Sequence, residues 1–127
     1  NNKIPYITNG YNDNIACMSQ EIRIEKEVSK ILLFGFAEWG DYHEDIVIKS
    51  GNEYFSKKIF FCEFHHNNKN VWTGEKMKGC KCRFTLATNL RERVGLYQVS
   101  VVLKSCRLIN YVVLPENPAI HIFSITI

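Results

Sequence analysis

The residues of this sequence that could do chemistry are five cysteines and four histidines. They are Cys17, Cys62, Cys80, Cys82, Cys106, His43, His65, His66 and His121. A cysteine beside a histidine can act as a nucleophile, but a reactive thiolate needs a stabilising site such as a helix N-terminus. None of these cysteines has a sequence context of that kind. We therefore expect structural cysteines and surface histidines, and we predict no catalytic residue and no enzyme activity.

A metal site is the next chemistry that these residue types suggest. Only one residue separates Cys80 from Cys82, whereas structural zinc sites use two to four so that the turn can wrap around the ion. The acidic residues of segment 38–45 lack the spacing of a calcium-binding loop, and a solvated connection is expected there. The sequence therefore predicts neither a metal nor another cofactor.

Disulfide bonds are the chemistry that the five cysteines fit best. Their odd number leaves one thiol free or bonded outside this chain. Cys80 and Cys82 are unsuited to bond to each other in an extended chain, so we expect them to bond to two of Cys17, Cys62 and Cys106. Each such bond would stabilise the fold by about 2–4 kcal/mol. Five reduced, buried cysteines in a cytosolic domain are the alternative.

The size and composition indicate one ordinary globular domain. The chain has 127 residues, of which 46% are hydrophobic and 23% charged. This length fits a single domain over 1–127, with 1–14 as a lead-in segment. The net charge of +3 is mild, so no nucleic-acid partner is expected. Because the chain opens without Met and closes inside a strand-like segment, we expect a domain cut from a longer protein.

The elements that would position these residues are short β-strands. Alternating or continuous apolar runs predict strands at 4–8, 19–24, 31–39, 44–49, 59–65, 81–88, 97–103, 107–114 and 121–127. A helical spacing of apolar residues at 24–32 leaves a short helix open as an alternative there. The frequent turns and the lack of alternating strands and helices predict an all-β chain, folded as a two-sheet antiparallel β-sandwich.

The second half of the chain carries a pattern of spaced residues. Asn89 ends one predicted strand, Tyr97 begins the next, Cys106 follows, and Pro115 precedes the last apolar strand. Over about 40 residues, this pattern resembles the third ectodomain of the hapless gamete fusogens, which belong to the class II fusion proteins (fusexins). The interval from Tyr97 to Cys106 is longer than in that family, and the Cys80–Cys82 unit has no counterpart there.

The resemblance implies an immunoglobulin-like sandwich in the membrane-proximal part of a single-pass protein on the gamete surface. The domain would do no chemistry. It would fold back along a trimer and pack against other domains of its chain and against homotrimer partners, while parts of the protein outside this chain contact the membrane. The exposed aromatics Trp39, Tyr42 and Tyr54 are the candidate contact residues, or alternatively belong to the rim of the core. The AT-rich composition and the absence of glycosylation sequons suit an apicomplexan parasite.

Two other functions fit the same residues. The first is an extracellular adhesion or ligand-binding sandwich of an unrelated surface protein. The second is a cytosolic lipid- or protein-binding sandwich with free thiols. Counting reactive thiols after denaturation distinguishes the second from the extracellular functions, because disulfides persist mainly in oxidising compartments.

Overall fold

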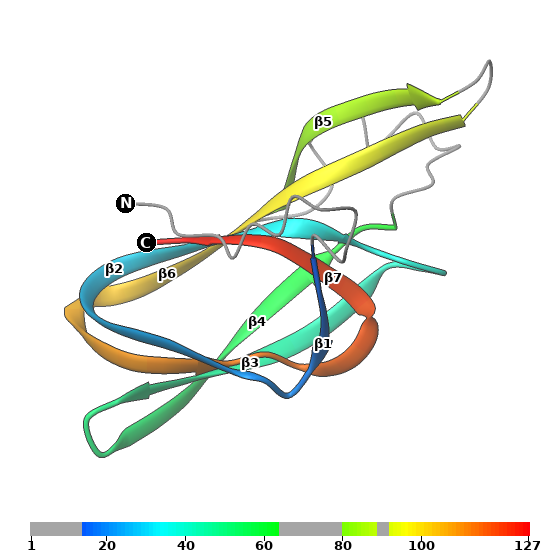
Figure 1. Ribbon diagram of the computed structural model, residues 1–127. Coiled ribbons are helices and arrows are strands. Elements are labelled where there is room, and N and C mark those ends of the chain that lie inside the picture. Colours follow the sequence, from blue (N-terminus) through cyan, green and yellow to red (C-terminus); the bar gives the residue numbers. More distant parts are fainter. Residues whose placement is uncertain (1–13, 64–79, 89–91) are drawn as a thin grey trace.

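The computed structural model describes residues 14–63, 80–88 and 92–127, with side chains at all of these except 80–96. The described residues form seven strands (Figure 1). These are β1 (Ile15–Met18), β2 (Glu21–Ala37), β3 (Tyr42–Ser50), β4 (Glu53–Phe61), β5 (Cys80–Thr88), β6 (Glu92–Val113) and β7 (Glu116–Thr126). None of the described residues belongs to a helix long and apolar enough to cross a membrane.

The strands form one hydrogen-bonded sheet in which every pair of named strands is antiparallel. Its order is β1-β7-β2-β6-β3-β4, and β5 pairs with the first part of β6. The prediction of an all-β chain is therefore confirmed. The predicted strands at 44–49, 81–88 and 121–127 correspond to β3, β5 and β7. The predicted strand at 4–8 lies outside the described residues, and β1 was not predicted.

β2 is one strand where the sequence predicted two, at 19–24 and 31–39, and the alternative of a short helix is wrong. Irregular pairing explains the difference. The register with β6 shifts at 23–26 and again at 28–30, and Glu25 has a left-handed φ of 52°. A bulge adds a residue that has no partner, so the apolar side chains no longer alternate strictly along the strand. The resulting spacing of apolar residues resembles a boundary between two separate strands.

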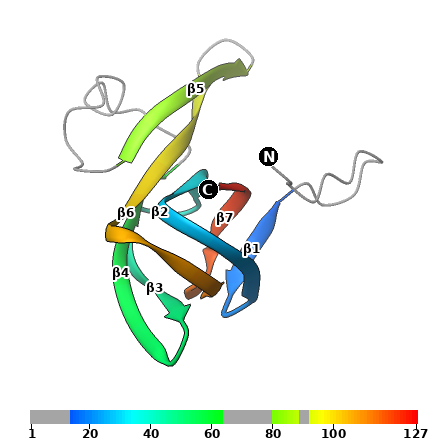
Figure 2. The same cartoon turned by 90° about the vertical axis from the view of Figure 1, so that its left-hand side faces the viewer.

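β6 also joins two predicted strands, 97–103 and 107–114. The predicted break between them is a large bulge at 103–106, where β6 has four residues between successive pairs and β2 has one. The strand changes direction there (Figure 2), because the extra residues must bend out of the ladder. The predicted strand at 59–65 differs as well, since β4 begins at Glu53 and ends at Phe61.

The core lies on the concave side of this bent sheet. Its buried members come from β1, β2, β3, β4, β6, β7 and the segments that follow β4 and β6. The largest fully buried side chains are Tyr97, Phe61, Ile31, Leu33, Ile46, Ile48, Ile59, Ile109, Leu114, Ile120, Ile122 and Val112. The sheet curls until the end of β4 reaches β2, where the Ala37 amide donates a hydrogen bond to the Cys62 carbonyl over 2.9 Å. The Tyr97 hydroxyl donates to the Glu63 carbonyl over 3.4 Å at the same place. These bonds join the residues that follow the edge strand β4 to the inner strands β2 and β6.

The β3–β4 hairpin carries the features described below. The turn residues Gly51 and Asn52 connect its strands, and Ser50, whose type also favours a turn, is the last residue of β3. Gly51 has a left-handed φ of 59°, and its amide donates to the Asn110 side chain over 2.7 Å. Pairing in strict register along the hairpin gives β4 two faces, one carrying Tyr54 and the other Phe55.

Candidate functional site

The predicted contact residues Trp39, Tyr42 and Tyr54 lie in different environments. Trp39 and Tyr54 are 84% and 60% exposed, whereas Tyr42 is half-buried and packs against the core. Tyr42 pairs with Phe61 at one end of the β3–β4 hairpin, and Tyr54 pairs with Lys49 at the other. Trp39 lies just before Tyr42 in the sequence, next to the end of the hairpin opposite to Tyr54. The structure therefore does not bring Trp39 and Tyr54 together.

A row of side chains surrounds Tyr54 on the outer face of the sheet. The register places Arg23 of β2, Tyr111 of β6, Lys49 of β3 and Tyr54 of β4 side by side on neighbouring strands. Tyr54 and Tyr111 approach through their hydroxyls, which are 3.3 Å apart. The Lys49 ammonium lies 5.5 Å from the Tyr54 ring centroid and 5.2 Å from that of Tyr111, within cation–π distance. We call Arg23, Tyr111, Lys49 and Tyr54 the aromatic row.

The contacts in the aromatic row shift the pKa values of the Tyr54 and Tyr111 phenols in opposite directions. Hydrogen bonds from Tyr111 and Lys49 lower the pKa of Tyr54 below its usual value. The same contact with Tyr54 raises the pKa of Tyr111 to about 12, because the Tyr111 hydroxyl then acts as the donor to a more acidic phenol. The row is therefore an electrostatically coupled unit, in which one phenol loses its proton well before the other.

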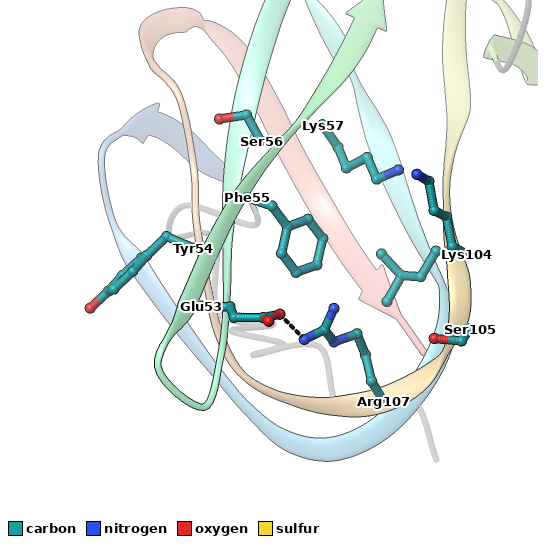
Figure 3. Close-up of a pocket in the computed structure, with 9 residues that line it drawn as sticks. Glu53, Tyr54, Phe55, Ser56, Lys57, Lys104, Ser105 and Arg107 are labelled. Atoms are coloured by element: carbon teal, nitrogen blue, oxygen red, sulfur yellow. Dashed lines mark hydrogen bonds and ion pairs between the residues drawn. The ribbon is translucent and has the colours of Figure 1, made fainter.

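A pocket of about 460 Å³ lies on the opposite side of β4, between residues 53–57 and the 103–107 segment of β6. Its charged lining residues are Glu53, Lys57, Lys104 and Arg107, and its apolar residues are Phe55 and Leu103. Figure 3 shows Tyr54 pointing away from the space between these side chains. Tyr54 is thus among the lining residues of the pocket, but its side chain extends away toward the aromatic row.

Arg107 is held in place on the pocket wall by contacts along its whole guanidinium group. It forms an ion pair with Glu53, and its Nε donates to the Ser50 hydroxyl over 2.9 Å. Its guanidinium carbon also lies 5.2 Å from the Phe55 ring centroid. Ser50 is itself buried and donates to the Leu108 carbonyl over 2.6 Å. This network ties the β3–β4 turn to the bulge of β6.

The predicted disulfide cysteines divide into buried and exposed groups. Cys17 and Cys62 are buried, Cys106 is exposed in the β6 bulge, and no disulfide joins these three residues. Burial, with a smaller contribution from Glu44, raises the pKa of the Cys17 thiol to about 12. The backbones of Cys80 and Cys82 pair with those of Val99 and Tyr97, and their side chains lie outside the described part of the chain.

The acidic residues of segment 38–45 do not form the solvated loop that we expected, because two of them belong to β3. Each carboxylate has its own partner within the fold. Glu38 lies 3.3 Å from His121, Asp41 accepts from the Glu63 amide, Glu44 accepts from Asn117, and Asp45 lies 3.5 Å from Lys58. These contacts give the four residues structural roles. Among the described side chains, no group of three or more metal-binding residues occurs.

The two described histidines, His43 and His121, also contact the fold. His43 packs edge-on against Phe60, and His121 stacks on Phe36 with its centroid 5.0 Å away. The His121 Nδ1 lies 2.8 Å from the Asn14 side-chain oxygen. His121 is thus half-buried instead of exposed on the surface. His65 and His66 lie outside the described residues.

The described positions of the fusogen-like pattern fall on β6 and on the connection that follows it. Tyr97 is buried in the first half of β6 and does not begin the strand, which starts at Glu92; Cys106 is within the same strand, and Pro115 is buried in the connection to β7. Asn89 lies outside the described residues. No protein-family model matches this sequence, and no curated protein matches it.

Proposed function

We propose that this chain is a non-enzymatic module that binds a protein partner through its aromatic row. The exposed Tyr54 phenol, fixed by Tyr111 and Lys49, is the observation that carries this proposal. Tyrosine is favoured at protein interfaces because it combines apolar area with a polar tip. Side chains that are already ordered lose less conformational entropy on binding. The cross-strand contacts of the row therefore prepare this surface for a partner.

The proposal extends to the setting of the module. We infer a membrane-proximal domain of a gamete surface fusogen, whose partners are other domains of the same protein and its homotrimer. The sequence pattern of Tyr97, Cys106 and Pro115 supports this inference. An immunoglobulin-like sandwich belongs to the same proposal, and the bend in β6 supports it because the sheet turns back over its own apolar face (Figure 2).

Site-specific photo-crosslinking tests the contact surface. A photoreactive phenylalanine analogue replaces Tyr54 in the full-length protein on the cell surface, and the matched control carries the same analogue at Lys26, an exposed residue of β2. We expect a crosslinked protein product from position 54 and little from position 26. Equal crosslinking from the two positions, or none from position 54, would contradict the proposal.

A gamete-mixing assay tests the setting separately. An antibody against this domain should prevent the merger of gamete membranes while leaving gamete attachment intact. Loss of attachment would instead favour an adhesion module, which is the second candidate function. Neither result depends on which surface of the domain crosslinks, so the two experiments can fail independently.

A further inference from the structure

We propose that the pocket between β4 and the β6 bulge binds an oxyanion, the phosphate or sulfate ester group of a small ligand. The proposal rests on two lysines, Lys57 of β4 and Lys104 of β6, which line the pocket together. Figure 3 shows their ammonium groups directed toward one another across it. The strand register and the β6 bulge bring them together, although they are far apart in the sequence.

The charges of the pocket are not balanced. Its lining contains three cationic side chains and a single carboxylate, that of Glu53. Arg107 forms an ion pair with that carboxylate, and it also donates a hydrogen bond to Ser50 and contacts the Phe55 ring. Among the described residues, no carboxylate forms an ion pair with Lys57 or Lys104. Two like charges facing each other repel, and an anion placed between them would replace this repulsion with two attractions.

The surroundings of the lysines strengthen the attraction. Phe55 is half-buried and Leu103 is buried, so apolar surface lies beside the charged groups. Electrostatic interactions gain strength where apolar walls replace water. Lysine is also a common ligand for phosphate groups, and its ammonium can donate three hydrogen bonds. These features favour a compact oxyanion with several acceptor oxygens over a single carboxylate.

The size of the pocket indicates what carries the anionic group. A volume of about 460 Å³ falls in the range of small-molecule sites and exceeds the needs of an inorganic ion. The ligand would place its oxyanion between the two lysines and its remaining part against Phe55. The proposed ligand contacts differ from those of the protein contact, because the Tyr54 side chain points away from the space between the lysines, although Tyr54 is also a lining residue.

Titration of the full chain, followed by amide NMR at constant ionic strength, tests the proposal. The probes are pyrophosphate, a sulfated heparin disaccharide, and vesicles containing phosphatidylserine. We expect at least one probe to shift the amides of residues 53–57 and 103–107, and the tightest one identifies the source of the oxyanion. Shifts confined to other residues, or none with any probe, would overturn the proposal.

Matched variants test the role of the two lysines. Replacing both, Lys57→Met with Lys104→Met, should weaken binding about tenfold or more, because charge-assisted hydrogen bonds are lost. Lys58→Met is the control, since Lys58 is on the other face of β4 and pairs with Asp45. Equal weakening by the control and the double variant would overturn the proposal.

A third variant changes the affinity in the opposite direction and does not depend on the lysine substitutions. Glu53→Gln removes the one carboxylate among the described lining residues and releases the Arg107 charge. We expect it to tighten the binding of the best probe by about threefold or more. Unchanged or weaker binding would overturn the proposed electrostatic basis.

Discussion

The hydroxyl oxygens of Tyr54 and Tyr111 lie 3.3 Å apart, although the two residues are 57 positions apart in the chain. Two strand pairings bring them together, because Lys49 of the central strand β3 is the partner of both residues. The contact therefore depends on the register of three strands at once. It links the proposed protein-binding surface to the β3–β4 turn and to the second half of β6.

The titration of the two phenols is a direct test of this contact. Tyr111→Phe removes the largest cause of the lowered pKa of Tyr54, so the first tyrosinate should appear at a higher pH than in the original protein. The near-ultraviolet absorbance of tyrosinate measures this change. Tyr42→Phe is the control, because that ring packs against the core at the other end of the hairpin. The contact is disproved if both variants leave the first ionisation at the same pH.

The same pair predicts how stability depends on pH. Tyr54 loses its proton more easily in the folded state than in the unfolded state, so its contribution to stability grows as pH rises toward 10. Tyr111 keeps its proton up to about pH 12 when folded, so its contribution is present below pH 10 and is lost between 10 and 12. Urea unfolding across this range should show the loss in the original protein. Tyr111→Phe should abolish the part due to Tyr111.

Local sequence signals predicted much of the fold. The segment Ser50, Gly51 and Asn52 indicated where β3 ends, and its last two residues form the β3–β4 turn. Alternation located β3, which pairs with β4 in unbroken register, and also β5 and β7, whose pairings with β6 and β2 each contain one register shift. The continuity of β2 and β6 was not predictable in this way. Their bulges interrupt the alternation, and only the partner strand shows that the chain continues through them.

The candidate sites depend on information that the local sequence does not hold. Tyr54 was recognised as an exposed aromatic residue, but its partner Tyr111 is placed by long-range register. The pocket is likewise lined by residues from segments 53–57 and 103–107, which are far apart in the sequence and come together only in the folded sheet. Charge patterning could have flagged Lys57 and Lys104 individually. Nothing in their spacing indicates that they face each other.

Trp39 offers a test of whether a surface residue is kept at the expense of stability. It has a left-handed φ of 61° and an 84% exposed side chain. That backbone conformation costs a non-glycine residue about 1–2 kcal/mol. Trp39→Gly should therefore leave the protein as stable as before or slightly more stable, and Trp39→Ala, which keeps the strain, should be about 1 kcal/mol less stable than Trp39→Gly. Equal unfolding free energies of the two variants in urea would contradict the assignment of strain.

Gly35 is expected to tolerate no side chain. A β-carbon there would lie 2.0 Å from the His121 carbonyl oxygen of β7, and this neighbour is backbone that cannot rotate away. Gly35→Ala should destabilise the protein by about 3 kcal/mol, as judged from urea unfolding. Gly51→Ala is the matched control, since a β-carbon there meets nothing within 4 Å. Its cost should be limited to the left-handed backbone, about 1–2 kcal/mol. The reverse order of the two variants would show that β2 and β7 do not approach so closely.

Thiol reactivity separates Cys17 from Cys106 in the folded protein. Only the thiolate reacts with iodoacetamide, and burial raises the pKa of Cys17 to about 12. At pH 8 we expect rapid alkylation of the exposed Cys106 and almost none of Cys17, as measured by mass spectrometry of the peptides. Denaturation in urea should bring Cys17 to the rate of Cys106, which serves as the control for reagent access. Equal rates before denaturation would contradict the buried position of Cys17 in β1. Failure of Cys17 to react after denaturation without reductant, followed by reaction once reductant is added, would instead show that this thiol is held in a disulfide.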